Sequence, residues 1–300
     1  MLEARGVTVE RGGRKLLDDV SVTVPQARVT VIIGANGAGK STLIKVLSGE
    51  IRPSQGEALL DGRDLRTFSA AELSRRRALV PQSTTLSFPF SVMEVVRLGA
   101  SVPGFDDDNE HANRIAEDAL SDVDLQGFRD RLYSELSGGE RQRVHVARAL
   151  CQLNCALQLQ DETKVLLLDE PTSNLDLAHQ SLVLAEAREQ AREGRAVAVV
   201  LHDLNLAAAW ADEIVLLHAG RVAARGVPVA IFRDDLLSAA FGCAIQANKA
   251  PPPGVPYMLP HLVRPSGEIS GHTKPLAGCP AASGVGYAGG RSWRPVAARD

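Results

Sequence analysis

The feature that most constrains the fold is a glycine-rich loop that joins an apolar run to a helical segment. Residues 29–33 (VTVII) are apolar and mostly β-branched, which predicts a short buried strand, and residues 42–48 have helical character. A GxxxxGK[ST] loop between a strand and a helix typically directs its backbone amides toward nucleotide phosphates. The loop residues are Gly34, Ala35, Asn36, Gly37, Ala38, Gly39, Lys40 and Ser41.

Side chains at the end of this loop and at a second strand have distinct expected roles. We expect Lys40 to pair with the β- and γ-phosphates and the Ser41 hydroxyl to bind Mg²⁺. The apolar run 165–168 (VLLL) predicts a buried strand, and two adjacent acids, Asp169 and Glu170, follow it. Where two adjacent carboxylates lie beside phosphates, one binds Mg²⁺ and the other polarises the attacking water. We therefore assign Asp169 to metal binding and Glu170 to the general base.

A third element, residues 136–140 (LSGGE), lies upstream of these acids. Ser137, with Glu140 three residues later, fits a capping box and predicts a helix over residues 136–150. The amides of Gly138 and Gly139 at such a helix N-terminus would attract an anion. Alone, the pattern fits a simple helix cap, but beside the other two elements it indicates one kind of ATPase.

On these three elements the sequence resembles the nucleotide-binding subunit of an ABC transporter, over about residues 2–261. The resemblance implies that Gln82 contacts Mg²⁺ and senses a membrane partner, and that His202 touches the γ-phosphate. It also implies that the loop ending at Asp176 crosses a dimer interface. By the same resemblance, Thr42 joins the phosphate loop, Ser137, Gly138 and Gly139 in the nucleotide-binding set.

Arg11 departs from the family pattern. Where an aromatic residue commonly stacks on adenine, just before the turn at Gly12 and Gly13, this chain has an arginine. A guanidinium plane can stack on a purine face, which keeps Arg11 in the nucleotide-binding set. A solvated surface arginine remains the alternative.

The expected fold class is α/β: a P-loop NTPase (RecA-like) core with a mostly parallel sheet, an N-terminal antiparallel β part and an inserted helical subdomain. Strands are expected near residues 31, 80, 167, 199 and 215, and at 2–9 and 20–24, with a hairpin in 57–65 that turns at Asp61 and Gly62. We expect one ATPase domain over residues 1–262, with the helical subdomain at about 83–150. Residues 263–300, rich in Gly, Pro, Ser and Ala, are expected to form a disordered tail.

Composition excludes several classes of function. The net charge of −3 suggests no nucleic-acid partner, and the basic residues Arg75, Arg76 and Arg77 lack interleaved aromatic residues and fit a solvated helix face. No apolar run approaches the ~18 residues that a membrane span needs, and the first residues lack the charged-then-apolar pattern of a signal segment, so we expect neither feature. Cys151 and Cys155 lack further ligands nearby, so we expect buried thiols.

The resemblance also implies cofactors and partners. These are ATP and Mg²⁺, a second copy of the chain in an ATP-sandwich dimer, two integral membrane permease subunits and, indirectly, a periplasmic solute-binding protein. The expected location is peripheral, on the cytoplasmic face of the inner membrane. Translation-associated ABC proteins usually carry two nucleotide-binding halves, and chromosome-maintenance ATPases separate theirs by a long coiled coil, so the single motif set without heptads disfavours both.

The transported solute is inferred from resemblance alone. Residues 74–82 (SRRRALVPQ) and 88–96 (FPFSVMEVV) resemble the iron-chelate and cobalamin importer group. Residues 151–164 and 175–180 (LDLAHQ) are similar to its heme-importing branch. The resemblance therefore implies an ATPase that energises heme (hemin) uptake, with ferric-siderophore or cobalamin import as the alternative.

Overall fold

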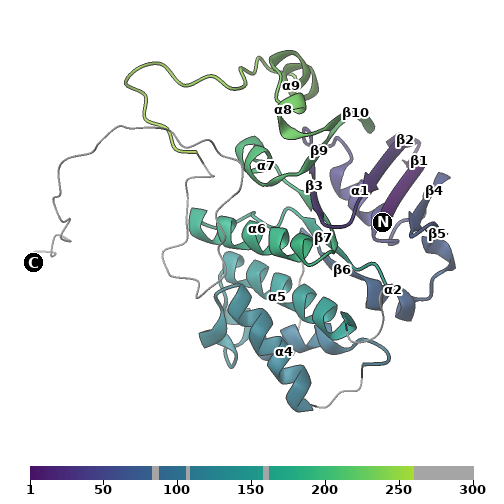
Figure 1. Cartoon of the computed structure of the whole chain (residues 1–300), viewed down its shortest axis with the longest axis vertical. Helices are drawn as coiled ribbons and strands as arrows, with labels where there is room; N and C mark the ends of the chain where they lie inside the picture. The colour runs from purple at the N-terminus through teal and green to yellow at the C-terminus, as the bar shows by residue number, and fades with distance from the viewer. Residues whose placement is uncertain (83–87, 106–108, 158–161, 260–300) are drawn as a thin grey trace, which may run out of the picture. The chain divides into compact units, whose positions relative to one another are not determined.

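The structure, a computed structural model, describes residues 1–82, 88–105, 109–157 and 162–259. Two sheets and a set of helices make up this part of the chain (Figure 1). The expected tail, residues 263–300, lies outside the described residues.

The larger sheet has six strands in the order β10-β9-β3-β8-β7-β6. All neighbours are parallel except β10, which pairs antiparallel with β9. The five strands expected near residues 31, 80, 167, 199 and 215 are confirmed, and β10 is an additional edge strand. The strands are β3 (Arg28–Ile33), β6 (Arg77–Val80), β7 (Val165–Asp169), β8 (Ala196–Val200), β9 (Glu213–His218) and β10 (Arg221–Gly226).

The smaller sheet is antiparallel, with the order β2-β1-β4-β5. Its strands are β1 (Leu2–Arg11), β2 (Arg14–Val24), β4 (Gln55–Leu60) and β5 (Arg63–Asp64). The expected hairpin is confirmed: Asp61 (φ 52°) and Gly62 (φ 78°) both take the left-handed conformation that a tight two-residue turn requires. Strands β1 and β2 extend beyond the expected ranges because they pair with each other as far as Arg11 and Arg14.

Successive side chains of each strand point to opposite faces of the larger sheet, and each face is covered by its own hydrophobic core. Leu166 and Leu168 of β7 face one core, and Val165 and Leu167 face the other. The first core contains α6 (Leu177–Arg192), α7 (Leu204–Trp210) and the α3–α5 helices, and the second contains α1 (Lys40–Leu47) and the antiparallel sheet. A parallel sheet covered on both faces explains why every residue of β7 and β8 is buried.

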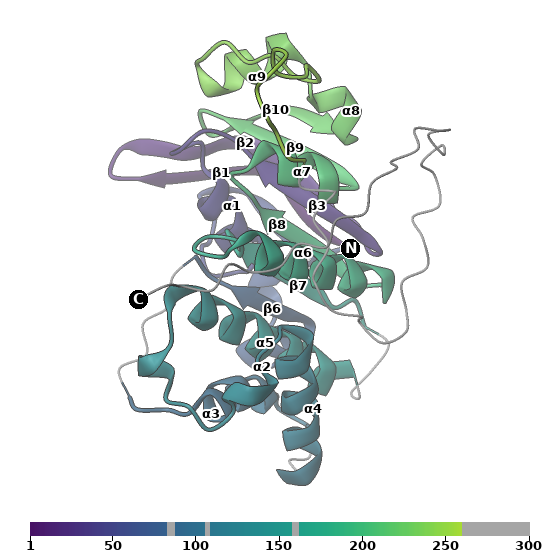
Figure 2. The same cartoon turned by 90° about the vertical axis from the view of Figure 1, so that its left-hand side faces the viewer.

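A helical part lies beyond the β6 edge of the sheet, as Figure 2 shows. It contains α3 (Val92–Arg97), α4 (Asn109–Asp122) and α5 (Gly138–Leu157), with 3-10 turns η2 (Leu98–Ala100), η3 (Gln126–Phe128) and η4 (Tyr133–Glu135). The remaining helical elements are η1 (Leu65–Thr67), α2 (Ala70–Arg76), α8 (Pro228–Ile231) and α9 (Asp234–Phe241).

The limits of α5 correct the expected helix over residues 136–150. The helix begins at Gly138, after the capping serine, and continues to Leu157. It extends because Cys151, Leu153 and Cys155 are fully buried where α5 packs against its helical neighbours. The buried thiols are thereby confirmed, and the described part of the chain holds no cluster of His, Cys, Asp or Glu suited to a metal.

The arginine run is not a solvated helix face. Arg76, the last residue of α2, is buried and forms ion pairs with Asp61 and Glu162, while Arg77 begins β6. The sequence pattern missed this because both acids come from other parts of the chain. Among the described residues, no helix is long and apolar enough to cross a bilayer.

Candidate nucleotide site

The glycine-rich loop is held tightly between β3 and the N-terminus of α1. A Cβ atom at Gly34 would lie 2.3 Å from the carbonyl oxygen of Leu217 in β9, and one at Gly39 would lie 2.7 Å from the carbonyl oxygen of Leu16. Gly39 also has φ 103°, a conformation that favours glycine. These contacts fix the loop at the carboxyl edge of the parallel sheet, the usual position for ligand sites in α/β folds.

Lys40 begins α1 and extends its side chain along the loop. Only 5% of the residue is exposed, and its Nζ donates to the carbonyl oxygens of Gly34 (2.9 Å) and Ala35 (3.1 Å). Burial lowers the pKa of Lys40, although the carboxylates of Glu170 and Asp169 act to raise it. The loop thus holds a buried ammonium group within the electrostatic field of two acids.

Ser41 and Asp169 place two oxygen donors side by side. The Ser41 hydroxyl donates to Oδ1 of Asp169 over 3.3 Å. Burial raises the pKa of Asp169, and Glu170 adds to this, while the Ser41 hydrogen bond, Lys45 and Lys40 oppose it. Sequence reasoning missed Lys45, which follows Ser41 by one helical turn and therefore points to the same side of α1. The four-residue spacing between Ser41 and Lys45 is the sequence signal that places Lys45 near the site.

Side chains from three separate segments of the chain meet at Glu170. Its Oε1 is 2.5 Å from Nε2 of His202, and its Oε2 accepts a hydrogen bond from Nε2 of Gln82 over 2.8 Å. Glu170 itself is buried, whereas 47% of the His202 side chain is exposed. The geometry gives one buried carboxylate an amide donor on one oxygen and an accessible imidazole on the other.

The backbone at Glu170 adopts an uncommon conformation. Its φ of 54° lies in the left-handed region, which is costly for a residue other than glycine. Ser173 stabilises the turn, because its Oγ donates to the Glu170 carbonyl oxygen over 2.9 Å. This hydrogen bond helps to hold the turn that carries the Glu170 carboxylate.

The segment around Ser137 forms a second, separate group. Ser137 and Glu140 form the expected capping box, with hydrogen bonds of 2.7 and 3.3 Å. A Cβ atom at Gly139 would lie 2.8 Å from the carbonyl oxygen of Asn174, and Asp176 caps α6 by accepting from the amide of His179. In the described ranges, no hydrogen bond or ion pair joins this group to the phosphate loop of the same chain.

The remaining predicted nucleotide contacts lie within α1 or at the surface. Thr42 is half-buried in the first turn of α1. Arg11 is exposed at the end of β1. No hydrogen bond or ion pair connects Arg11 to the loop in the part of the chain that the structure describes.

A phosphate loop that opens a helix, opposite two acids at the carboxyl edge of a parallel sheet, defines a P-loop nucleotide hydrolase. Comparison with known families narrows this class. The family described as ABC transporter matches residues 17–173, and the chain belongs to this family, as an ATP-binding subunit that hydrolyses ATP.

Similar proteins include bacterial import subunits. The chain is 44% identical over 260 residues to hemin import ATP-binding protein HmuV of Rhizobium meliloti (strain 1021), and 46% identical over 262 residues to the protein of that name in Chelativorans sp. (strain BNC1). Each alignment covers 87% of this chain and 98% of the relative.

Solved structures of the family resemble the fold. A putative metal-chelate type ABC transporter in an inward-facing conformation matches with TM-score 0.66 and 28% identity, covering 81% of this chain and 89% of that chain. A dimeric bacterial ABC transporter cassette matches with TM-score 0.66 and 26% identity, covering 76% of this chain and 99% of that chain.

Proposed function

We propose that this chain is the ATP-hydrolysing subunit of an importer for heme (hemin). The similarity to hemin import ATP-binding proteins over 98% of their length carries this proposal. Ferric-siderophore or cobalamin import is the second candidate, favoured by the similarity to a putative metal-chelate type transporter.

The nucleotide is held at the phosphate loop. The amides of residues 34–39 and the Lys40 ammonium bind the β- and γ-phosphates. The oxygens of Ser41 and Asp169 fit a hard cation, so these residues, with Gln82, would hold Mg²⁺. When bound, Mg²⁺ neutralises charge that develops on the phosphate oxygens.

We assign hydrolysis to Glu170 and the two side chains that contact it. Its carboxylate accepts the proton of the attacking water, and Gln82 orients that carboxylate through its amide hydrogen bond. His202 contacts the other oxygen of Glu170, and its partly exposed ring would touch the γ-phosphate. Arg11 stacks on the adenine base from the end of β1.

The two separate groups of nucleotide-binding residues support a dimer. Ser137, Gly138, Gly139 and Asp176 of one copy would complete the site at the phosphate loop of the other. Mixing a Ser137→Arg variant with a Lys40→Ala variant tests this, because the mixed dimer keeps one intact composite site. We expect more ATPase activity in the mixture than in either parent, and equal activity would refute the arrangement across two copies.

The transport complex supplies the membrane part. We place the dimer, with residues 1–262 of each copy as the ATPase domain and about 83–150 as its helical subdomain, on the cytoplasmic face of the inner membrane. Its partners are two permease subunits and, indirectly, a periplasmic solute-binding protein. The similarity to ATP-binding proteins of hemin import supports this placement.

Growth of a deletion strain tests the solute. On heme as sole iron source, we expect growth to be lost, to return with the wild-type chain and to stay absent with Glu170→Gln. On a ferric siderophore, growth should persist. Unimpaired growth on heme, with loss of growth on the siderophore, would overturn the heme assignment and leave the ATPase mechanism intact.

A further inference from the structure

The ring of His179 lies between two carboxylates that come from different parts of the fold. Its Nδ1 is 2.8 Å from Oδ1 of Asp176, the residue that caps α6. Its Nε2 is 3.7 Å from Oδ2 of Asp124, two residues beyond α4. A protonated imidazole donates from both nitrogens and therefore attracts both acids. His179 thus connects the start of α6 to the helical part of the chain.

Local sequence sets the contact with Asp176. Its Oδ1 accepts from the backbone amide of His179 over 2.9 Å, as is usual for an aspartate that precedes a helix. The side chain of His179, three residues later, lies on the same face of the first turn and reaches the same oxygen. These hydrogen bonds from His179 lower the pKa of Asp176, so its carboxylate stays charged beside the ring.

The position of Asp124 is fixed from α5, the helix that begins at Gly138. Arg143 of α5 is buried, and its Nη1 donates to the carbonyl oxygens of Val123 and Asp124, each over 2.8 Å. The same Nη1 lies 4.0 Å from Oδ2 of Asp124. A buried arginine of α5 therefore holds the acid that His179 contacts.

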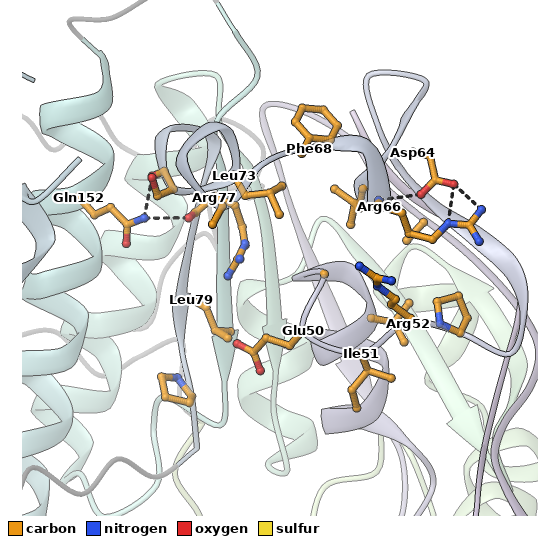
Figure 3. A pocket seen from close by; sticks show the side chains of 18 of the residues that line it. Glu50, Ile51, Arg52, Asp64, Arg66, Phe68, Leu73, Arg77, Leu79 and Gln152 are labelled. Atoms are coloured by element: carbon orange, nitrogen blue, oxygen red, sulfur yellow. Dashed lines mark hydrogen bonds and ion pairs between the residues drawn. The ribbon is translucent and has the colours of Figure 1, made fainter. Parts of the chain in front are cut away.

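The two halves of α5 are tied to the rest of the chain at different places. Figure 3 shows Gln152, in the second half of α5, whose Nε2 donates to the carbonyl oxygens of Ser74 (2.7 Å) and Arg77 (3.0 Å). Gln152 thereby ties the second half of α5 to α2 and β6. The contacts of His179 link the first half, through Arg143, to the start of α6.

The loop that ends at Asp176 also packs directly on the first turn of α5. A Cβ atom at Gly139 would lie 2.8 Å from the carbonyl oxygen of Asn174. This close packing limits the separation of the two segments, and the directional contacts of the His179 ring limit their relative orientation. The loop and the first turn of α5 are thus held as one unit.

We propose that His179 is a positioning residue for ATP hydrolysis, which holds the loop that ends at Asp176 against the helical part so that both act together on the nucleotide of the other copy. The proposal rests on the proposed function, in which Ser137 and Asp176 of one copy complete the site at the phosphate loop of the other. The side chains of Asp176 and Asp124 are 66% and 65% exposed, so their contacts with His179 contribute little to stability. We therefore expect the effect in the rate of hydrolysis and not in folding.

Substitutions of His179 test whether the ring must reach both acids. His179→Ala removes both contacts, whereas His179→Asn keeps a donor near the position of Nδ1 but does not reach Asp124. We expect each variant to lose about tenfold in kcat, with the KM for ATP changed by less than about threefold, because the phosphate loop is intact. Wild-type turnover of His179→Asn would show that the ring only caps α6 and would overturn the proposal.

Asp124→Asn tests the same contact from the other side. Asparagine suits the left-handed backbone at this position (φ 56°), so the variant should fold. It should reproduce the loss in kcat, and combining it with His179→Asn should cost less than about a further threefold, because both changes break one contact. Asp130→Asn, at an acid of the helical part that is 89% exposed, is the matched control and should keep wild-type turnover.

Melting temperatures show whether each variant is folded. If the His179 variants fail to fold, Asp124→Asn decides alone, and wild-type turnover of that variant would refute the proposal. Losses that multiply in the double variant would show that the two residues act independently, which also contradicts a shared contact.

Mixed dimers show in which copy the ring acts. When Lys40→Ala is mixed with Ser137→Arg, the intact composite site takes Ser137 and Asp176 from the Lys40→Ala copy. Adding His179→Ala to that copy should lower the activity of the mixture about tenfold, whereas adding it to the Ser137→Arg copy should lower it by less than about threefold.

The mixtures also separate this inference from the proposed dimer. Equal losses from both placements of His179→Ala would overturn the inference and leave the dimer standing. If the mixture without His179→Ala is no more active than its parents, the proposed dimer fails, and the inference fails with it.

Discussion

Replacing Glu170 by Gln should nearly abolish ATP turnover while preserving ATP binding. The substitution keeps the volume of the side chain and both of its contacts. The new carbonyl oxygen can accept from Gln82, as Oε2 does over 2.8 Å, and the new amide can donate to Nε2 of His202. The negative charge is lost and, with it, the capacity to take up a proton.

The expected fall in the rate of hydrolysis follows from the loss of the general base. Removing a positioned general base lowers the rate by about 10²- to 10⁴-fold, which corresponds to about 3–5 kcal/mol in activation free energy. ATP affinity should change by less than about threefold, or ~0.6 kcal/mol, because the number of hydrogen bonds at position 170 is unchanged.

Phosphate release under saturating ATP measures turnover, and titration with ATP at low temperature measures binding. Glu189→Gln, the same change at an exposed position of α6, serves as the control and should be indistinguishable from wild type. Turnover of Glu170→Gln within about tenfold of wild type would refute the assignment of the base. A large loss of ATP affinity would show that the charge of Glu170 is needed before the chemical step.

Two further predictions concern stability. Gly99→Ala should lower the free energy of unfolding by about 2–3 kcal/mol, because its Cβ would overlap the Arg148 carbonyl oxygen, whereas Gly127→Ala, with open space around it, should have little effect in the same urea titration. Burial raises the pKa of Glu186 to about 7, so the folded state retains a proton that the unfolded state releases and stability falls as pH rises from about 4.5 to 7. Glu186→Gln can keep the hydrogen bond from Gln190. Its free energy of unfolding should therefore exceed that of wild type by about 1–3 kcal/mol at pH 8 and by much less at pH 5. An equal difference at both pH values would contradict the raised pKa of Glu186.

Local pattern was sufficient for several elements. The phosphate loop, the capping box of Ser137 and Glu140, and the turn at Asp61 and Gly62 all depend on residues within a few positions of one another. Propensity and hydrogen bonding at that range are encoded directly in the sequence. The β-branched apolar runs likewise predicted the five buried strands of the larger sheet.

Other features depended on contacts between distant segments. The pattern around Arg76 is that of a solvated helix, yet Asp61 and Glu162 pair with it and allow its burial. The length of α5 was underestimated because its last turns are stabilised by packing of Leu153 and its neighbours rather than by a periodic signal.

The sequence by itself determined the chemistry that is available: a phosphate loop, two adjacent acids and a helix that opens with glycines. Only the tertiary structure decided which groups meet. Gln82, Glu170 and His202 follow β6, β7 and β8 by one or two residues, and they converge because these three strands are parallel neighbours in the sheet. Strand order arises from the packing of whole segments into two cores, and no local sequence signal specifies it.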